Sequence, residues 1–180
     1  MTTKRRRIDQ IQDPEFLHDL PALSADELRE RRGMCDDLDL EFSYYRRMLH
    51  GRMDLLTFEM RRRAGEEQQT LLEALPRILA GGAYSTEPGL PSRSIPVDVP
   101  DIPSPGRRLI DRALQGDFLA RLVELSDQDL RDTHRFLEDL EAEVSMHRRV
   151  VHSVLDRLQA ELTRRYREGL VDPGELLTRG

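Results

Sequence analysis

The stretch that decides the fold is LSADELRERRGMCDDLDLEFSYYRRMLHGRMDLLTFEMRRR, residues 23–63, because the chain repeats it 102 residues further on. Its counterpart, residues 125–165, reads LSDQDLRDTHRFLEDLEAEVSMHRRVVHSVLDRLQAELTRR and aligns with it without a gap. Extended back to residue 15, the alignment covers 49 positions, of which nineteen are identical. An internal repeat of this kind indicates that the fold is built from two copies of one unit, and we interpret it as a duplication.

Each copy begins with a signal for the start of a helix. Ser24 is followed three residues later by Glu27, and Ser126 by Asp129, which is the spacing of a capping box. Apolar residues then recur over more than four heptads, a pattern that favours a coiled coil over a generic surface helix. The predicted core positions are Leu28, Cys35, Leu38, Phe42, Tyr45, Leu49 and Leu56 in the first copy, and Leu130, Leu137, Leu140, Val144, His147, Val151, Val154 and Leu158 in the second.

The other segments divide the chain into two repeats, a linker and two tails. Residues 14–80 and 107–170 are each predicted to form a short helix followed by a long coiled-coil helix. The proline-rich residues 81–106 are predicted to form a linker, residues 1–13 a disordered tail and residues 171–180 a second tail. The predicted fold class is therefore all-α, a two-helix coiled coil formed by internal duplication. Three charged residues interrupt the hydrophobic seam of the first copy, which is the line of its apolar core positions: Arg31, Arg52 and Glu59.

Composition narrows the classes of function. The net charge of -6 argues against general nucleic-acid binding, so no direct DNA binding is expected. No apolar run approaches the roughly 20 residues that a membrane span needs. The single cysteine, Cys35, excludes an intrachain disulfide and fits a reducing compartment, so we expect a cytoplasmic protein. The sequence has no glycine-rich phosphate loop and no nucleophile elbow, and Cys35 lies at a core position, so no enzyme activity is expected.

Five polar residues share one face of each long helix. In the second copy they are spaced by four, three, four and four residues, which places them within a wedge of about 80°. They are Glu141, Ser145, Arg148, His152 and Asp156, and their counterparts are Asp39, Ser43, Arg46, His50 and Asp54. Four of the five positions are identical, whereas neighbours such as Tyr44 and Met146 differ between the copies. This repetition favours a binding site.

The heptad register places these polar residues beside the hydrophobic seam. In an antiparallel pair of helices, four of them would line one common groove: Asp39, Arg46, Glu141 and Arg148. Arginine presents a planar fork of donors that suits phosphate or the edge of guanine. A carboxylate can accept hydrogen bonds from guanine N1–H and the N2 amine, and Ser and His can donate to phosphate oxygens. The face therefore suits a guanine nucleotide.

Two other interpretations remain open at this point. The face can be a solvated flank of a purely structural coiled-coil adaptor, in which ion pairs at i,i+3 and i,i+4 each contribute about 0.2–0.5 kcal/mol. Alternatively, His50 with Asp54, and His152 with Asp156, have the i,i+4 spacing of two ligands on one metal ion. Against metal binding, an arginine lies one turn from each pair and would oppose a bound cation.

The repeated face resembles the signature of the RsiG family, anti-sigma factors controlled by cyclic di-GMP, whose motif is E-x3-S-x2-R-x3-Q-x3-D. The two copies here read D-LEF-S-YY-R-RML-H-GRM-D and E-AEV-S-MH-R-RVV-H-SVL-D, so His50 and His152 replace Gln and Asp39 replaces Glu. The resemblance implies an antiparallel coiled coil that binds two molecules of cyclic di-GMP, partly intercalated as a dimer. It further implies that the liganded protein sequesters a WhiG-type sigma factor and so represses developmental transcription, as in sporulation.

The resemblance also implies roles for the residues of the face. The arginines would contact the guanine edge or phosphate, and Asp54 and Asp156 the Watson–Crick edge of guanine. The serines and histidines would contact phosphates or ribose. Histidine in place of Gln keeps a hydrogen-bond donor, and it makes binding sensitive to pH because a protonated imidazole favours phosphate.

Overall fold

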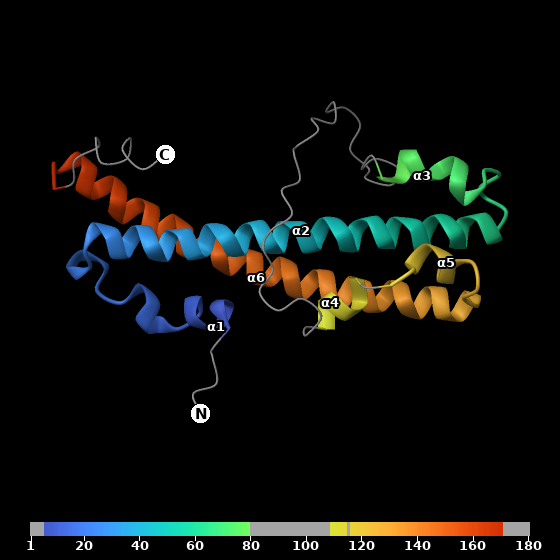
Figure 1. Ribbon diagram of the computed structural model, residues 1–180, viewed down its shortest axis with the longest axis horizontal. Helices are drawn as coiled ribbons and strands as arrows, with labels where there is room; N and C mark the ends of the chain where they lie inside the picture. The colour runs from blue at the N-terminus through green and yellow to red at the C-terminus, as the bar shows by residue number, and fades with distance from the viewer. Residues whose placement is uncertain (1–5, 80–108, 115, 171–180) are drawn as a thin grey trace. The chain divides into compact units, whose positions relative to one another are not determined.

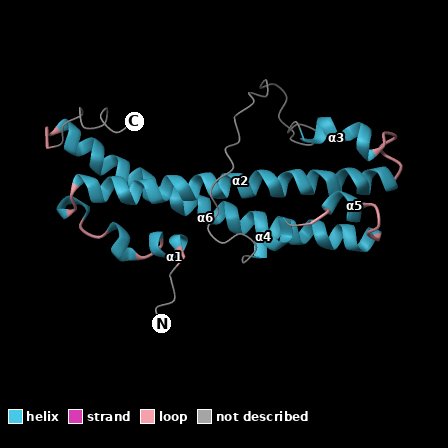
Figure 2. Cartoon of the chain, viewed as in Figure 1, coloured by secondary structure: helices cyan, strands magenta, loops and turns pink. Residues whose placement is uncertain are grey.

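The structure, a computed structural model, describes residues 6–79, 109–114 and 116–170, and these form helices joined by turns (Figures 1 and 2). The α-helices are α1 (Arg7–Ile11), α2 (Ala25–Arg63), α3 (Leu71–Leu79), α4 (Leu109–Leu114), α5 (Phe118–Leu122) and α6 (Asp127–Arg167), and the 3-10 helices are η1 (Pro14–Leu17) and η2 (Leu20–Ala22). The all-α prediction is confirmed. The predicted linker and C-terminal tail, residues 81–106 and 171–180, lie outside the described residues. No helix in the described part of the chain has the length and apolarity needed to cross a bilayer.

The chain forms two compact units. Each of the long helices α2 and α6 is shared between them, with one part in the first unit and the other part in the second. The first unit consists of Met1–Phe42 with Met146–Gly180, and the second of Ser43–Ser145. In the second unit, Arg46 pairs with Glu141 and Arg63 pairs with Asp127. Residue numbers therefore increase along α2 in the direction in which they decrease along α6. The first unit shows the same order. Within each unit the two long helices are therefore antiparallel.

The heptad positions form the core of each unit. Every predicted core residue except His147 is buried, and the half-buried His147 ring stacks on Phe42 with centroids 5.6 Å apart. Burying one large aliphatic side chain contributes about 1.5–3 kcal/mol, so these layers are the main source of stability. Burial also raises the pKa of Cys35 to about 12, which keeps its thiol protonated and unreactive.

Both predicted capping boxes are formed. The Ser24 amide donates to Glu27 at 2.7 Å, and the Glu27 amide donates back to Ser24 Oγ at 3.2 Å. Ser126 and Asp129 make the same pair of bonds at 3.3 and 3.1 Å. These bonds satisfy amides that have no partner within the helix, and they fix where α2 and α6 begin.

The N-terminal segment corrects one prediction, because residues 7–11 form α1 rather than part of a disordered tail. Ile8 and Ile11 are buried, and Arg7 Nη2 donates to the buried Glu41 carboxylate at 2.7 Å. Two buried apolar residues and an ion pair to the buried Glu41 therefore hold α1 in the first unit.

The sequence does carry a signal for α1. At the same offset of 102 residues, Ile8 and Asp9 match Ile110 and Asp111 of α4. Ile110 is buried, and the Tyr45 hydroxyl donates to Asp111 at 2.7 Å within the second unit. The duplication therefore extends through α1 and α4.

Two of the charged residues that interrupt the first seam bind the short segments. The guanidinium of Arg31 lies over the Phe16 ring, 5.3 Å from its centroid, and donates to the Phe16 carbonyl. Arg52 lies 4.7 Å from the centroid of Phe118, the counterpart of Phe16, and donates to the Ala113 carbonyl at 2.6 Å. These arginines therefore position the segments that precede the long helices.

Glu59, the third of these charged residues, belongs to an end cluster in the second unit. Its buried carboxylate accepts from Arg62 Nε at 2.8 Å and from Arg63 Nε at 2.7 Å. Arg63 Nη1 also donates to the Leu125 carbonyl at 2.7 Å, just before α6 begins. The end of α2 is thus tied to the start of α6.

The first unit contains the counterpart of this end cluster. Glu161 accepts from Arg164 Nε at 2.9 Å and from Arg165 Nε at 2.8 Å. Arg165, itself buried, donates to the carbonyls of Leu20 and Pro21 at 2.8 and 3.3 Å. The duplication therefore repeats the end cluster as well as the predicted polar face.

The end cluster of the first unit predicts a loss of stability in acid. Hydrogen bonds from Arg164 and then Arg165 lower the pKa of Glu161 to about 2, against partial burial, whereas the unfolded value is near 4.5. Because the folded pKa is depressed, this contribution is complete above pH 4.5 and is lost as the pH falls towards 2. Thermal unfolding followed by circular dichroism should show Glu161→Gln with a lower Tm than the parent at pH 6 and a smaller further loss at pH 3. An equal fall in Tm between pH 6 and pH 3 for the parent and for Glu161→Gln would contradict the prediction.

Candidate functional site

The first unit brings together three residues of the predicted face, which we call the Asp39 cluster. Asp39 lies on α2, and Arg148 and His152 lie one turn apart on α6. Asp39 Oδ1 accepts from Arg148 Nε at 2.8 Å and lies 2.6 Å from His152 Nε2. One carboxylate oxygen therefore holds both basic side chains of the opposite helix.

The second unit contains the equivalent Glu141 cluster. Glu141 lies on α6, and its Oε1 accepts from Arg46 Nε at 2.9 Å and lies 3.2 Å from His50 Nε2. Ser145 Oγ, one turn along α6, donates to the same oxygen at 2.7 Å. The longer Glu side chain thus takes a hydroxyl as well as the two basic groups.

Each cluster combines residues from both copies of the motif. The acid comes from one copy, and the arginine and histidine come from the other. The pairings are those expected for e positions in an antiparallel coiled coil, because Arg46 meets Glu141 and Arg148 meets Asp39. The sequence identified the members of the face, but a single helix could not reveal this exchange.

The clusters are accessible to a ligand. About one third of each arginine side chain is exposed, with 32% for Arg46 and 31% for Arg148, and His50 and His152 are about half exposed. Partial burial raises the pKa of Glu141, but hydrogen bonds from Ser145 and Arg46 outweigh it and leave this pKa below its usual value. Glu141 is therefore ionised at neutral pH and neutralises Arg46.

Three residues of the predicted face do not join the clusters. Ser43 is half-buried and, unlike Ser145, has no hydrogen bond to its own copy's acid among the described contacts. Asp54 is half-buried, and burial raises its pKa while the charges of His50 and His134 oppose the increase. Asp156 is exposed. The two aspartates that end the motifs thus lie in different surroundings.

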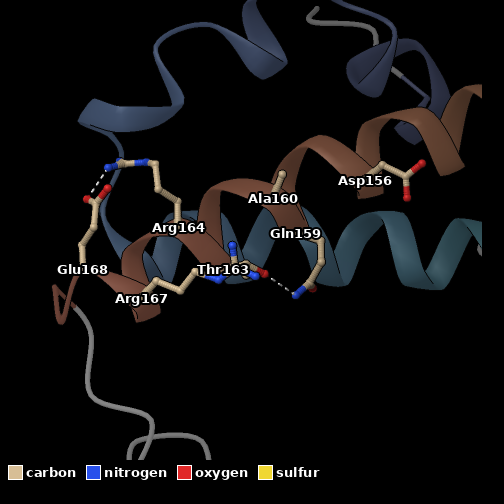
Figure 3. A pocket seen from close by; sticks show the side chains of 7 residues that line it. All are labelled: Asp156, Gln159, Ala160, Thr163, Arg164, Arg167 and Glu168. Atoms are coloured by element: carbon tan, nitrogen blue, oxygen red, sulfur yellow. Dashed lines mark hydrogen bonds and ion pairs between the residues drawn. The ribbon is translucent and has the colours of Figure 1, made fainter.

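Asp156 opens onto a pocket that the sequence did not predict. The pocket has a volume of about 510 Å³ and lies along the C-terminal part of α6 in the first unit (Figure 3). It is lined by Asp156, Gln159, Ala160, Thr163, Arg164, Arg167 and Glu168. Gln159 donates to Thr163 at 3.2 Å within it. The last residue of the second motif therefore lies at this pocket.

The arrangement differs from the one that the metal hypothesis requires. Within the described ranges, no three side chains of His, Cys, Asp or Glu converge in a way that could hold a metal ion. His50 instead shares a Glu141 carboxylate oxygen with Arg46, whose permanent positive charge would oppose a cation bound at that oxygen.

A polar contact that the sequence does not predict joins α2 and α6 in the second unit. Thr57 Oγ1 of α2 lies 3.2 Å from His134 Nε2 of α6, inside the second unit. Thr57 follows Asp54 by three residues and so continues the stripe of the motif, which is the signal that could have identified it.

Comparison with known proteins shows that the chain is similar to one family. A family model described as RsiG-like matches residues 14–79 and 116–179, which together make up most of the chain. A search of curated proteins finds no match to it. The matched regions contain both copies of the polar face and both long helices.

Proposed function

Since the chain belongs to the RsiG-like family, we propose that it is an anti-sigma factor that binds cyclic di-GMP and then sequesters a WhiG-type sigma factor. Family membership indicates a regulatory, non-enzymatic role of the anti-sigma type, with a sigma factor as partner. The ligand, the type of sigma factor and the repression of developmental genes are the parts of the function that we propose.

The observation that carries the ligand proposal is the occurrence of two equivalent clusters. Each combines an arginine, a histidine and a carboxylate, with the basic groups partly exposed. Cyclic di-GMP carries guanine edges, which suit arginine and carboxylate, and phosphodiesters, which suit arginine and histidine. Two clusters of this kind support a stoichiometry of two ligand molecules per chain.

The acids of the clusters have a role that follows from their contacts. Asp39 and Glu141 each fix the arginine and histidine of the opposite helix before any ligand arrives. A preorganised side chain loses less conformational freedom on binding, which favours affinity. We therefore assign Asp39 and Glu141 as positioning residues for Arg148 and Arg46, respectively.

Isothermal titration of the full chain with cyclic di-GMP tests the ligand proposal. We expect saturation at two molecules per chain with a Kd in the micromolar range or below, and cyclic di-AMP should bind far more weakly because adenine lacks the guanine O6 and N2 groups. A stoichiometry of one, or no heat of binding at micromolar concentration, would overturn this part of the function.

Co-purification of the native protein tests the partner. Mass spectrometry of the bound proteins should identify a sigma factor, and the yield of that complex should rise when cyclic di-GMP is added. A purely structural coiled-coil adaptor would instead keep its partners whether or not ligand is present, and Arg46→Ala with Arg148→Ala would leave the complex intact.

A further inference from the structure

A second pocket adjoins the one at Asp156, on the same part of α6 in the first unit. It has a volume of about 460 Å³ and is lined by residues of α6 and of the η1–η2 segment, among them Leu17 and Leu20. Ala160 and Arg164, which Figure 3 shows in the first pocket, line both pockets. We call the two pockets together the α6 groove. Because Ala160 and Arg164 are exposed, the groove is open in the described part of the first unit.

The equivalent face of α2 is covered in the second unit. Four positions of α2 are more buried than their counterparts on α6 at the offset of 102 residues. Those on α2 are Asp54, Leu55, Thr57 and Phe58, and their counterparts are Asp156, Arg157, Gln159 and Ala160. The two polar residues of α2 are half-buried and the two apolar ones are buried, whereas all four counterparts are exposed.

The helix α3 is the element that distinguishes the two units on this face. It turns back beside the C-terminal part of α2 within the second unit (Figure 1), and its Ala74 and Ile78 are buried on one side of the helix. The other short segments occur in both units, since α1 matches α4 and the η1–η2 segment matches α5. In the first unit the described residues end at Leu170, shortly after α6, and include no counterpart of α3. The difference in burial between the two faces therefore follows α3.

The two long helices end with the same type of cap. Gly65 follows α2 and Gly169 follows α6, with φ values of 81° and 69°. The amide after each glycine donates to the carbonyl five residues earlier, in the pairs Glu66–Arg61 at 2.9 Å and Leu170–Arg165 at 3.0 Å. This is the Schellman arrangement. The chain therefore leaves α6 by the same local geometry by which it leaves α2 towards α3.

The sequence after α6 repeats the start signal of α3. The Thr70 amide donates to Glu73 at 2.8 Å, and the Glu73 amide donates back to Thr70 Oγ1 at 3.4 Å, which forms a capping box. At the offset of 102 residues stand Asp172 and Glu175, and aspartate is a favoured residue for this cap. Pro173 occupies the first helical position, where proline is common. The match to the family model also extends to residue 179.

Apolar bulk is exchanged between the helix face and the segment that follows the helix. Ala160 takes the place of the buried Phe58, which removes a ring from the face of α6. Leu176 takes the place of the buried Ala74, which adds apolar bulk to the following segment. Apolar packing tolerates changes that keep the total volume, so the two replacements compensate each other when Leu176 lies over Ala160.

We propose that residues 172–180 bind the α6 groove as the counterpart of α3, with Leu176 over Ala160. Residues 171–180 can span about 33 Å when extended, and the groove from Asp156 to Glu168 is about 18 Å long at the rise of an α-helix. A helix this short is not stable in water by itself, so the apolar contact with the groove supplies its stability.

This docking has a consequence for the second motif. Asp156 lines the groove, so the bound segment partly buries it, as Asp54 is half-buried in the second unit. Both motifs then end at a partly covered aspartate. The inference depends on neither cyclic di-GMP nor a sigma factor, and its test uses neither, so it stands or falls separately from the proposed function.

The reactivity of a cysteine placed in the groove tests the docking in the full chain. Ala160→Cys introduces a thiol at the floor of the groove, and the native Cys35 is buried and reacts with the thiol reagent DTNB only on unfolding. Adding Leu176→Asp should make the introduced thiol react about tenfold faster, because a charged side chain releases the segment from the groove. Equal rates with and without Leu176→Asp would overturn the proposal.

Two controls accompany this measurement. Thr178→Asp adds the same charge at the position equivalent to the exposed Pro76 of α3, so it should leave the rate of Ala160→Cys unchanged. Arg149→Cys, exposed on α6 outside both pockets, should react at one rate with or without Leu176→Asp. A single fast thiol per chain shows that each variant is folded. An equal acceleration by Leu176→Asp and Thr178→Asp would contradict docking through the Leu176 side.

Protein concentration distinguishes the chain's own segment from a second copy. Protection of the thiol in Ala160→Cys by residues 172–180 of the same chain should not depend on concentration. Protection that appears only as the concentration rises would assign the groove to a second copy of the chain and overturn the proposal.

Discussion

Replacement of Arg148 by alanine is expected to weaken cyclic di-GMP binding about a hundredfold, because hydrogen bonds to charged groups contribute about 1.5–3 kcal/mol each. Arg148 Nε donates to Asp39 at 2.8 Å, and the side chain remains about one third exposed, so its other donors can reach a phosphate or guanine edge. Alanine removes those donors and leaves Asp39 as a negative charge beside the ligand phosphates.

Arg149→Ala is the matched control, because it removes the same charge from the next position of α6. Arg149 is exposed and points about 100° away from Arg148 around the helix, so the affinity should change by less than about threefold. Isothermal titration of both variants at one salt concentration makes the comparison. Arg46→Ala with Arg47→Ala repeats the test in the second unit. Equal losses within either pair would mean that net charge, rather than the face, determines binding.

Replacement of Arg165 by alanine is expected to have the largest effect on stability outside the apolar core, with a loss of about 2–4 kcal/mol. Arg165 is buried, pairs with Glu161, and donates to the carbonyls of Leu20 and Pro21. Its removal withdraws the donor from the Leu20 carbonyl in a buried position and from the Pro21 carbonyl, and it loosens the attachment of η2 to the end of α6.

Thermal unfolding followed by circular dichroism measures this effect. For a chain of this length the loss corresponds to a fall in Tm of about 5–15 °C. Arg164→Ala is the control, because Arg164 pairs with the same Glu161 but is 42% exposed, so its removal should lower Tm by only a few degrees. A Tm for Arg165→Ala equal to that of Arg164→Ala would show that the two carbonyl bonds do not stabilise the fold.

Local and periodic features were predictable from the sequence. The heptad pattern predicted the buried layers from Leu28 to Leu56, and the Ser24–Glu27 spacing predicted the start of α2. These features depend on residues a few positions apart on one helix. The charged interruptions were also visible, but their partners were not, because Arg52 binds a carbonyl 61 residues away.

The features that the sequence does not predict share a physical cause, because each depends on contacts between parts of the chain that are far apart in sequence. Heptad periodicity does not predict α1, because five residues are too few for a periodic signal and its stability comes from burial of Ile8 and a bond to Glu41. The membership of the polar face was predictable, but its division into two clusters depends on the antiparallel partner. The different surroundings of Asp54 and Asp156 arise in the same way, since they depend on which segments pack beside each helix.

The exchange of partners between the copies has a consequence for how the duplicated motifs can diverge. Arg46 and Asp39 belong to one motif but serve different clusters, whereas Arg46 and Glu141 belong to different motifs and share one. A substitution in one copy that breaks a cluster is therefore expected to be compensated by a change in the other copy. We expect the two copies to diverge through coupled changes at pairs such as Arg46 with Glu141.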